Sequence, residues 1–223
     1  DQEMKDAVAL EKAQTFIDAA SSTRNAESRD DLLGQAEQQL TSFLEQGTHP
    51  RVPEARLQLG RLQMVRGLQL MSGDPDEGKR QRARDAFASA ADTFDKIVEE
   101  LKGKLQEMQG ARIDADKDPE QAALRDRYRG EYLQALTSSG EARFEAAKTY
   151  KDPASEAKPL LDQALATFTD LSEKYDSYVQ GALAMLQRAE VQRELGMAQQ
   201  AMDSYMRMVE QQDADPLRLA KFQ

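Results

Sequence analysis

The sequence predicts an all-α fold, an α-solenoid of antiparallel helical hairpins, on three observations. Good helix formers dominate the composition, whereas Val and Ile together supply only ten of the 223 residues, too few for a sheet. Apolar residues recur at alternating intervals of three and four, which places them on one face of a helix. Breaker residues divide these periodic segments into pairs.

The apolar content is low for a folded chain. Leu, Ile, Val and Phe together account for 41 of 223 residues, and the formal net charge is −10. These values fall in the range in which disorder must be considered. Alanine is abundant, however, and the apolar residues keep a strict period that a solvated coil has no reason to maintain. We therefore expect a folded helical chain.

Apolar spacing and breakers predict the helices in order, over residues 2–21, 29–46, 53–72, 77–109, 119–150, 154–174, 177–195 and 198–212. They pair into hairpins over about 2–46, 53–109, 119–174 and 177–212, which makes residues 1–223 a single domain. Asp215 and Pro216 are typical of a helix start. We therefore expect a further helix over 215–223, with Leu217, Leu219 and Phe222 exposed.

Four of the helices share one pattern: a small residue, a large one four positions later, and an apolar residue three beyond. A small residue lets two helices approach closely, and the bulky residue fills the space beside it. Gly60 and Ala189 occupy the expected crossing points on two first helices, and Gly196 closes the helix before the last one. The four matches are Ala36/Leu40/Phe43, Ala83/Phe87/Ala90, Ala157/Leu161/Ala164 and Ala201/Tyr205/Met208.

This pattern resembles the second helix of a tetratricopeptide repeat, which pairs small residues at helix crossings with a large residue between them. The match is best over residues 177–216, and the stretch "FTDLSEKYDSYVQGALAMLQRAEVQRELGMAQQAMDSYMRMVEQ" is similar to the bacterial version of the repeat. The equivalent alanines lie 47, 74 and 44 residues apart instead of the family's 34, and the chain has no Trp. The array is therefore interpreted as degenerate and tetratricopeptide-like.

The interval of 74 residues between Ala83 and Ala157 is longer than two ordinary repeats need, and roughly residues 97–137 are the excess. They read as extensions of two helices, and about 13 extra residues in each would project on the order of 20 Å. We therefore predict a protruding arm made of an antiparallel helical pair. The alternative is a longer repeat that lies flush with its neighbours.

The resemblance implies a binding scaffold without catalysis, which holds a peptide or protein on side chains displayed by the first helix of each pair. The partner-binding residues are assigned by their spacing from the two crossing residues, Gly60 and Ala189. They are Arg61 and Met64 on one hairpin, and Glu190 and Arg193 on another. The acidic balance favours a basic or mixed-charge partner.

The methionines of the last hairpin offer a further candidate for partner binding. Met206 falls outside the apolar stripe of its helix and is the expected exposed residue. Met202 and Met208 are interpreted as core residues on that stripe.

Two alternatives of other classes stay open. The chain could be a structural subunit of a homo-oligomer or larger assembly, joined through its open repeat ends. A less favoured alternative is an RNA-binding helical repeat, because "RDRYRGEY" could stack bases on Tyr128 and Tyr132. The net negative charge disfavours nucleic acid and anionic membrane surfaces.

The residues that carry chemistry are sparse, so we expect no enzyme, no cofactor and no metal. Without cysteine the chain has no disulfide, thiolate zinc site or thiol nucleophile. His49 is the only histidine and lies in a turn, and "DADKDPE" lacks the glycine and glutamate of a calcium loop.

The sequence does not choose a compartment. The absence of cysteine suits the bacterial cytoplasm and the periplasm equally, and no apolar run reaches the length that inserts in a bilayer. Because Asp1 is preceded by no Met or signal, we expect a processed product or part of a longer or anchored protein.

Overall fold

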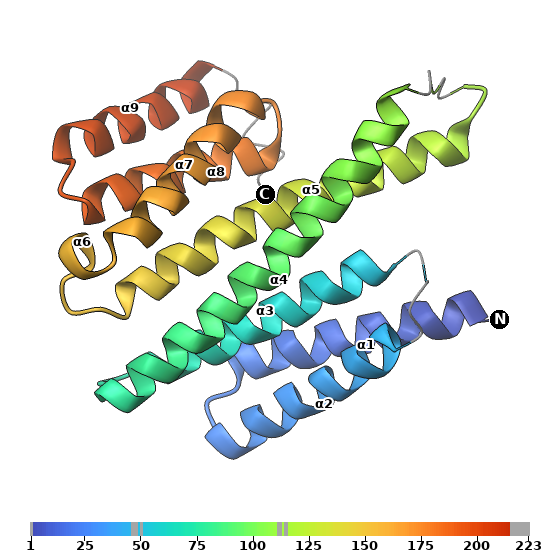
Figure 1. Ribbon diagram of the computed structural model, residues 1–223, viewed down its shortest axis with the longest axis horizontal. Coiled ribbons are helices and arrows are strands. Elements are labelled where there is room, and N and C mark those ends of the chain that lie inside the picture. Colours follow the sequence, from blue (N-terminus) through green and yellow to red (C-terminus); the bar gives the residue numbers. More distant parts are fainter. Residues whose placement is uncertain (1, 46–48, 50, 111–112, 114–115, 215–223) are drawn as a thin grey trace. The chain divides into compact units, whose positions relative to one another are not determined.

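The computed structural model describes residues 2–45, 49, 51–110, 113 and 116–214 (Figure 1). The all-α prediction is confirmed: helices joined by turns make up the described residues, and no strand occurs among them. The expected helix over 215–223, with Leu217, Leu219 and Phe222, lies outside this part of the chain. The helices are α1 (Gln2–Ser22), α2 (Ala26–Leu44), α3 (Val52–Leu70), α4 (Glu77–Gly110), α5 (Pro119–Lys148), α6 (Pro153–Glu156), α7 (Lys158–Lys174), α8 (Val179–Glu194) and α9 (Ala198–Ala214).

One predicted helix, over 154–174, is in fact two. The chain leaves helical geometry at Ala157, where φ is −123° and ψ is 21°, and this residue separates α6 from α7. Pro159 provides the physical reason, because it has no N–H to donate to residue 155 and its ring would clash with that carbonyl. A continuous helix through this point is therefore excluded.

The chain divides into two compact units, residues 1–135 and 136–223, and the boundary falls within α5. In the first unit α1 packs against α2, and α3 contacts α1, α2 and α4. Buried apolar side chains from α1, α2 and α3 form one cluster, which contains Leu10, Ala13, Ile17, Ala20, Leu33, Ala36, Leu40, Phe43, Val52, Ala55 and Leu62.

Two glycines on α3 allow α4 to approach closely. A Cβ atom on Gly60 would lie 2.5 Å from Cε1 of Phe94, and one on Gly67 would lie 2.5 Å from Cε1 of Phe87. Both pairs are seven residues apart along their helices, two turns in each case, so the same contact repeats along the helix pair. Gly60 was predicted as a crossing residue, whereas Gly67 was not.

Helices α4 and α5 are long, with 34 and 30 residues, as the sequence predicted for an elongated pair. Within the first unit Leu101 of α4 and Leu133 of α5 are buried, and Nζ of Lys104 lies 5.1 Å from the ring centre of Tyr128. That residues 97–137 form a protruding arm stays a prediction.

The second unit contains the end of α5, then α6, α7, α8 and α9, with α8 packed against both α7 and α9. Its helices also approach closely at glycine: a Cβ on Gly140 would lie 2.9 Å from the ring of Phe168, and one on Gly181 would lie 2.0 Å from the backbone oxygen of Tyr175. Phe168 is the largest fully buried side chain of this unit, and its ring fits there because Gly140 has no Cβ.

The turn between α8 and α9 is closed by Gly196, as predicted. Its φ of +74° is in the left-handed region, which glycine adopts without the steric cost of a Cβ. The N–H of Met197 donates to the carbonyl of Gln192 at 2.8 Å, and that of Gly196 donates to Arg193 at 3.0 Å. This is the double hydrogen bond of a Schellman motif, which ends α8 and turns the chain into α9.

The residues predicted to pack at helix crossings lie mostly in the interior. Tyr205 is half-buried, and the others are buried: Ala36, Leu40, Gly60, Ala83, Phe87, Ala90, Ala157, Leu161, Ala164, Ala189 and Ala201. Their burial is what an amphipathic helical fold requires. The solenoid arrangement itself stays a proposal.

Candidate functional site

The predicted partner-binding residues divide between the two units. Arg61 and Met64 belong to α3 in the first unit. Arg61 donates from Nη1 to Oε1 of Gln14 at 3.0 Å, and its Nη2 lies 3.5 Å from Oδ1 of Asp18. The guanidinium therefore links α3 to α1, and Met64 is half-buried. This half of the predicted surface is largely engaged within the fold.

The predicted residues of the second unit form a small polar network on α8 and α9. Nη2 of Arg193 lies 2.7 Å from Oε2 of Glu190, one turn away on α8. The hydroxyl of Tyr205 on α9 donates to Oε1 of the same carboxylate at 2.5 Å. This hydrogen bond, with a smaller contribution from burial, raises the pKa of Tyr205 above its ordinary value of 10.0. Glu190 thus joins the two helices and keeps both neighbours in place.

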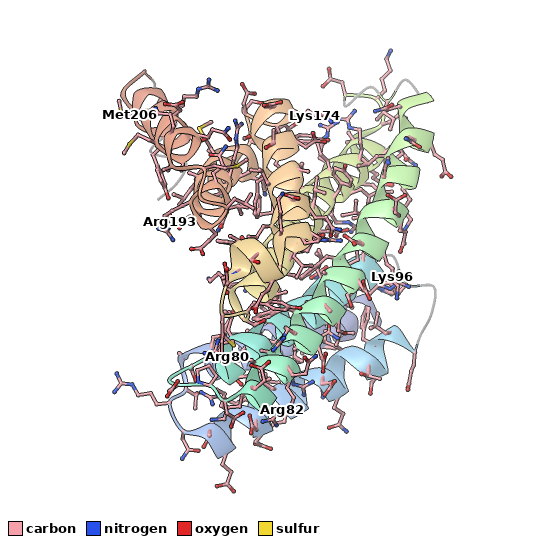
Figure 2. The ribbon with its side chains drawn as sticks, turned by 60° about the vertical axis from the view of Figure 1, so that its left-hand side comes forward. Arg80, Arg82, Lys96, Lys174, Arg193 and Met206 are labelled. Atoms are coloured by element: carbon pink, nitrogen blue, oxygen red, sulfur yellow. The ribbon has the colours of Figure 1, made fainter. Side chains whose placement is uncertain are left out.

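Exposed apolar side chains lie on the same two helices as this network. Met202 and Met206, four residues apart on α9, are 58% and 54% exposed, and Leu183 on α8 is 46% exposed. Leu183 lies seven residues before Glu190, two turns along the same helix face. Figure 2 shows Met206 and Arg193 pointing away from the α8–α9 pair. We name this set the α8–α9 surface: Leu183, Glu190, Arg193, Met202, Tyr205 and Met206.

The exposure of Met206 agrees with its placement outside the stripe, but the assignment of Met202 to the core is wrong. The fully packed face of α9 passes through Ala201 and Ser204, which are 4% and 5% exposed. Met202 follows Ala201 by one residue, and one residue is a rotation of about 100° around a helix. Its side chain therefore leaves the packed face, while Met208 is half-buried.

Sequence reasoning also missed Leu183, although a signal was present. The buried residues of α8 include Gly181, Ala184, Met185 and Ala189, which lie on one side of the helix. Val179 and Leu183, spaced by four, lie off that stripe and are both exposed. A second apolar pair outside the core stripe is the pattern that could have predicted exposed apolar residues on α8.

A second charged cluster lies in the first unit around Glu131 of α5, whose side chain is only 11% exposed. Burial raises the pKa of Glu131 from 4.5 to about 7, with Glu54 acting in the same direction. Arg127, Lys104 and Arg51 lower it, and Nε of Arg127 lies 3.8 Å from Oε1. Oε2 of Glu131 is buried and accepts no hydrogen bond in the described part of the chain. Glu131 therefore loses its proton at a higher pH than an ordinary glutamate.

Glu54, the acidic residue that raises the pKa of Glu131, is bound by Arg51. Nε and Nη2 of Arg51 donate to the two carboxylate oxygens of Glu54, each at 2.7 Å, in a bidentate pair. This hydrogen bond is the main cause of the raised pKa of Arg51. Among the influences on the pKa of Glu131, burial is the largest, ahead of the charges of Arg127, Glu54, Lys104 and Arg51.

Within the described residues, the arrangement of the His, Asp and Glu side chains and the apolarity of the helices bear on metal binding and on membrane insertion. No group of three or more His, Cys, Asp and Glu side chains there is arranged to hold a metal ion. None of the helices in that part of the chain has the length and apolarity to cross a bilayer. No protein-family model, curated protein or solved structure matches the chain.

Proposed function

We propose that the chain is a non-catalytic interaction scaffold that binds a peptide or protein on a tetratricopeptide-like helical surface. The observation that carries this proposal is the α8–α9 surface, where Leu183, Met202 and Met206 are exposed beside the Glu190–Arg193 ion pair. Exposed apolar groups rimmed by charges are typical of protein-binding surfaces. Methionine suits this role because its flexible, polarisable side chain adapts to a partner.

The chemistry of the partner follows from charge and from the polar network. The chain carries a net charge of −10, so a basic or mixed-charge partner is favoured by long-range attraction. Glu190 and Arg193 already form an ion pair with each other, so at the rim they orient the bound partner more than they add to its affinity. The apolar side chains of α9 supply the area that leaves water when the partner binds.

The burial of Tyr128 argues against the RNA-binding alternative. Stacking of RNA bases would need an open tyrosine face, but Tyr128 is only 9% exposed. Its ring has Nζ of Lys104 at 5.1 Å and Cζ of Arg127 at 5.7 Å from its centre. Self-association through the same α8–α9 surface, as in a structural subunit, is an outcome that the experiment distinguishes.

The experiment places a photocrosslinking amino acid at position 206 and, as a control, at Lys96 of α4, which is also exposed. Each protein is irradiated in a lysate of the source organism, and adducts are identified by mass spectrometry. We expect one defined adduct from position 206 that is absent from position 96. The double variant Met202→Glu plus Leu183→Glu should abolish that adduct, whereas Gln200→Glu, another exposed position of α9, should not.

The outcomes separate the proposals. An adduct with a different protein supports the scaffold. An adduct with a second copy of the chain, together with a dimeric mass in light scattering that Met202→Glu abolishes, supports the structural subunit instead. If positions 206 and 96 give the same adducts, the α8–α9 surface has no specific partner and the proposed function is wrong.

A further inference from the structure

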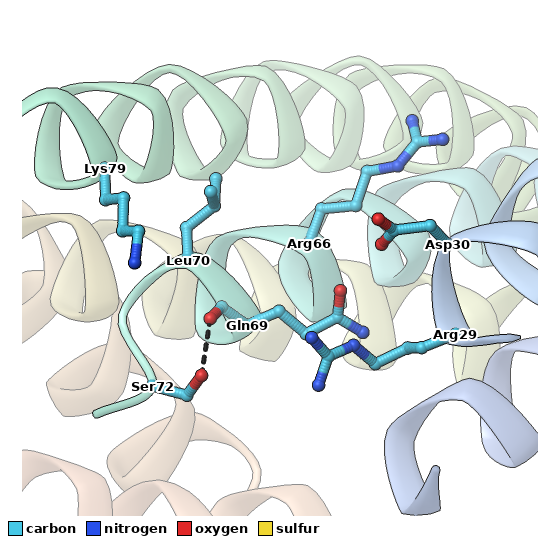
Figure 3. Close-up of a pocket in the computed structure, with 7 residues that line it drawn as sticks. All are labelled: Arg29, Asp30, Arg66, Gln69, Leu70, Ser72 and Lys79. Atoms are coloured by element: carbon cyan, nitrogen blue, oxygen red, sulfur yellow. Dashed lines mark hydrogen bonds between the residues drawn. The ribbon is translucent and has the colours of Figure 1, made fainter. Parts of the chain in front are cut away.

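The first unit contains a cavity that is separate from the α8–α9 surface. Its volume is about 410 Å³, which lies in the range of small-ligand sites. The beginning of α2, the end of α3, the turn after α3 and the first turn of α4 form its walls (Figure 3). The polar side chains that line it are Arg29, Asp30, Arg66, Gln69, Ser72 and Lys79.

The lining is cationic, although the chain as a whole is acidic. It includes two arginines and a lysine against one carboxylate, Asp30. Arg66 is neutralised by Glu37, which accepts from Nη1 at 3.1 Å and from Nη2 at 2.7 Å. This pairing also lowers the pKa of Glu37. The positive charge left for a ligand is therefore that of Arg29 and Lys79.

Two buried donors in the wall have no partner. Nε of Arg29 and Nε2 of Gln69 are shielded from solvent, yet neither makes a hydrogen bond within the described part of the chain. Figure 3 shows the guanidinium of Arg29 and the end of the Gln69 side chain pointing toward one another, with Lys79 reaching in from α4. Buried donors are almost always paired in folded proteins, and a turn of the Gln69 amide lets its oxygen accept from Nε of Arg29, which fixes the guanidinium at the cavity wall. A ligand in the cavity would be held by the charged side chains of Arg29 and Lys79, which line it.

We propose that this cavity binds a phosphate group carried by a small molecule. A phosphate monoester dianion has three terminal oxygens that point in different directions, which suits cationic donors that come from α2 and α4 around one space. A planar carboxylate presents two oxygens and would leave part of this set unpaired. The hydroxyl of Ser72 donates its one proton to the carbonyl of Gln69 at 2.7 Å, so it is not counted among the donors for the phosphate.

The overall negative charge does not prevent such binding. Exposed charges more than about 8 Å away are largely screened at physiological ionic strength, so the groups that line the cavity dominate. Asp30 is the one carboxylate among the residues that line the cavity, and its charge opposes an anion. This site lies in a different unit from the α8–α9 surface, so it stands or falls independently of the proposed scaffold function.

The test uses the whole chain and isothermal titration calorimetry with inorganic phosphate and glycerol 2-phosphate, at constant ionic strength. We expect saturable binding with a Kd of about 1 mM or tighter for both, equivalent to about 4 kcal/mol. Malonate, of similar charge, should bind at least tenfold more weakly. Because the second pKa of a phosphate monoester is near 6, affinity should rise between pH 5.5 and 7.5.

Single substitutions locate the site. Arg29→Gln and Lys79→Gln should each weaken binding about tenfold, since each removes a charge-assisted hydrogen bond. Gln69→Glu, which places a carboxylate opposite Arg29, should weaken it at least as much. Asp30→Asn should strengthen binding several-fold, a gain that misfolding cannot imitate. Lys96→Gln, which removes an exposed charge elsewhere on α4, should leave the Kd unchanged.

Three results would overturn the proposal. One is the absence of saturable heat with both phosphates up to about 20 mM, well above the expected Kd. Another is equal affinity for malonate. The third is a change in Kd for Arg29→Gln and Lys79→Gln that is no larger than the change for Lys96→Gln. Binding would then be explained by non-specific charge attraction.

Discussion

The ring of Phe94 occupies the space in which Gly60 would carry a Cβ atom, which would lie 2.5 Å from Cε1 of that ring. Carbon atoms that do not share a bond rarely approach within 3.4 Å, so this contact exists only because residue 60 is glycine. Phe94 is fully buried, so a Cβ at position 60 would force a side chain of the core to shift. The close approach of α3 and α4 therefore depends on one hydrogen atom in place of a methyl group.

Gly60→Ala is expected to lower the free energy of unfolding by about 1–3 kcal/mol, the usual cost of overpacking a core. Helix propensity alone would predict the opposite sign, a gain of about 0.5–1 kcal/mol. Chemical denaturation of the variant and the parent chain measures the difference.

The matched control for this substitution is Gly34→Ala in α2. A Cβ at position 34 would meet no atom within 4 Å, and the residue is exposed in the same unit. Gly34→Ala should therefore stabilise the chain through helix propensity. If both substitutions stabilise it, the α3–α4 contact is looser than described above.

Glu131 makes the stability of the first unit depend on pH. Its pKa is about 7 in the fold and 4.5 as the ordinary value, so the native state holds the proton more tightly. Between these two pH values the folded chain binds more protons than the unfolded chain, and stability falls as pH rises. From pH 5 to pH 8 this group should lower the free energy of unfolding by about 1–2 kcal/mol.

Glu131→Gln keeps the shape of the protonated side chain and cannot ionise. The variant should match the parent near pH 5 and exceed it in stability at pH 8. Urea denaturation at several pH values measures the difference between the two chains. Glu99→Gln, at an exposed position of α4, should give a difference that does not vary with pH. A flat difference for Glu131→Gln as well would show that Glu131 is not shielded from water.

The phenol of Tyr205 reports on the polar network of the α8–α9 surface. The carboxylate of Glu190 accepts its hydrogen bond and raises the pKa of Tyr205, whereas the charge of Arg193 lowers it. Glu190→Gln should therefore shift the pKa of Tyr205 down toward 10.0. Arg193→Gln should shift it further up. Titration of the ring carbons by NMR measures both shifts, and movement in the same direction would contradict the described contacts.

Helix positions could be predicted from the sequence because apolar periodicity and breakers are local signals. The bounds of most helices follow from them, and Gly196 could be predicted as a terminator because a helix end favours glycine in the left-handed region. The break at Ala157 was missed because the periodic stripe through Leu161 and Ala164 was given more weight than Pro159. A missing N–H overrides hydrophobic spacing at that point.

The candidate sites were less predictable, because they depend on which helix faces meet. Met202 has an apolar side chain close to the expected stripe, and only the packing of Ala201 and Ser204 reveals that it is outside. The pair of Arg61 with Gln14 and Asp18 links segments more than 40 residues apart, which spacing within one helix cannot predict. The cavity near Arg29 and Lys79 likewise joins residues from three helices.

The buried hydrogen bond between Ser204 and Gln192 tests how α8 and α9 are held together. Oγ of Ser204 donates to Oε1 of Gln192 at 2.8 Å, and both side chains are at most 5% exposed. Ser204→Ala leaves the amide oxygen without this donor and should lower the free energy of unfolding by about 1–2 kcal/mol.

Replacing both partners, with Ser204→Ala and Gln192→Leu together, removes the polar requirement and should cost less than the sum of the two single changes. A double-mutant cycle measured by chemical denaturation gives the coupling energy, expected at about 1 kcal/mol in favour of the pair. Additive effects would mean that the two side chains do not interact in solution. In that case the α8–α9 pair is held by its buried apolar residues, which include Ala189 and Ala201, and by the half-buried hydrogen bond between Tyr205 and Glu190.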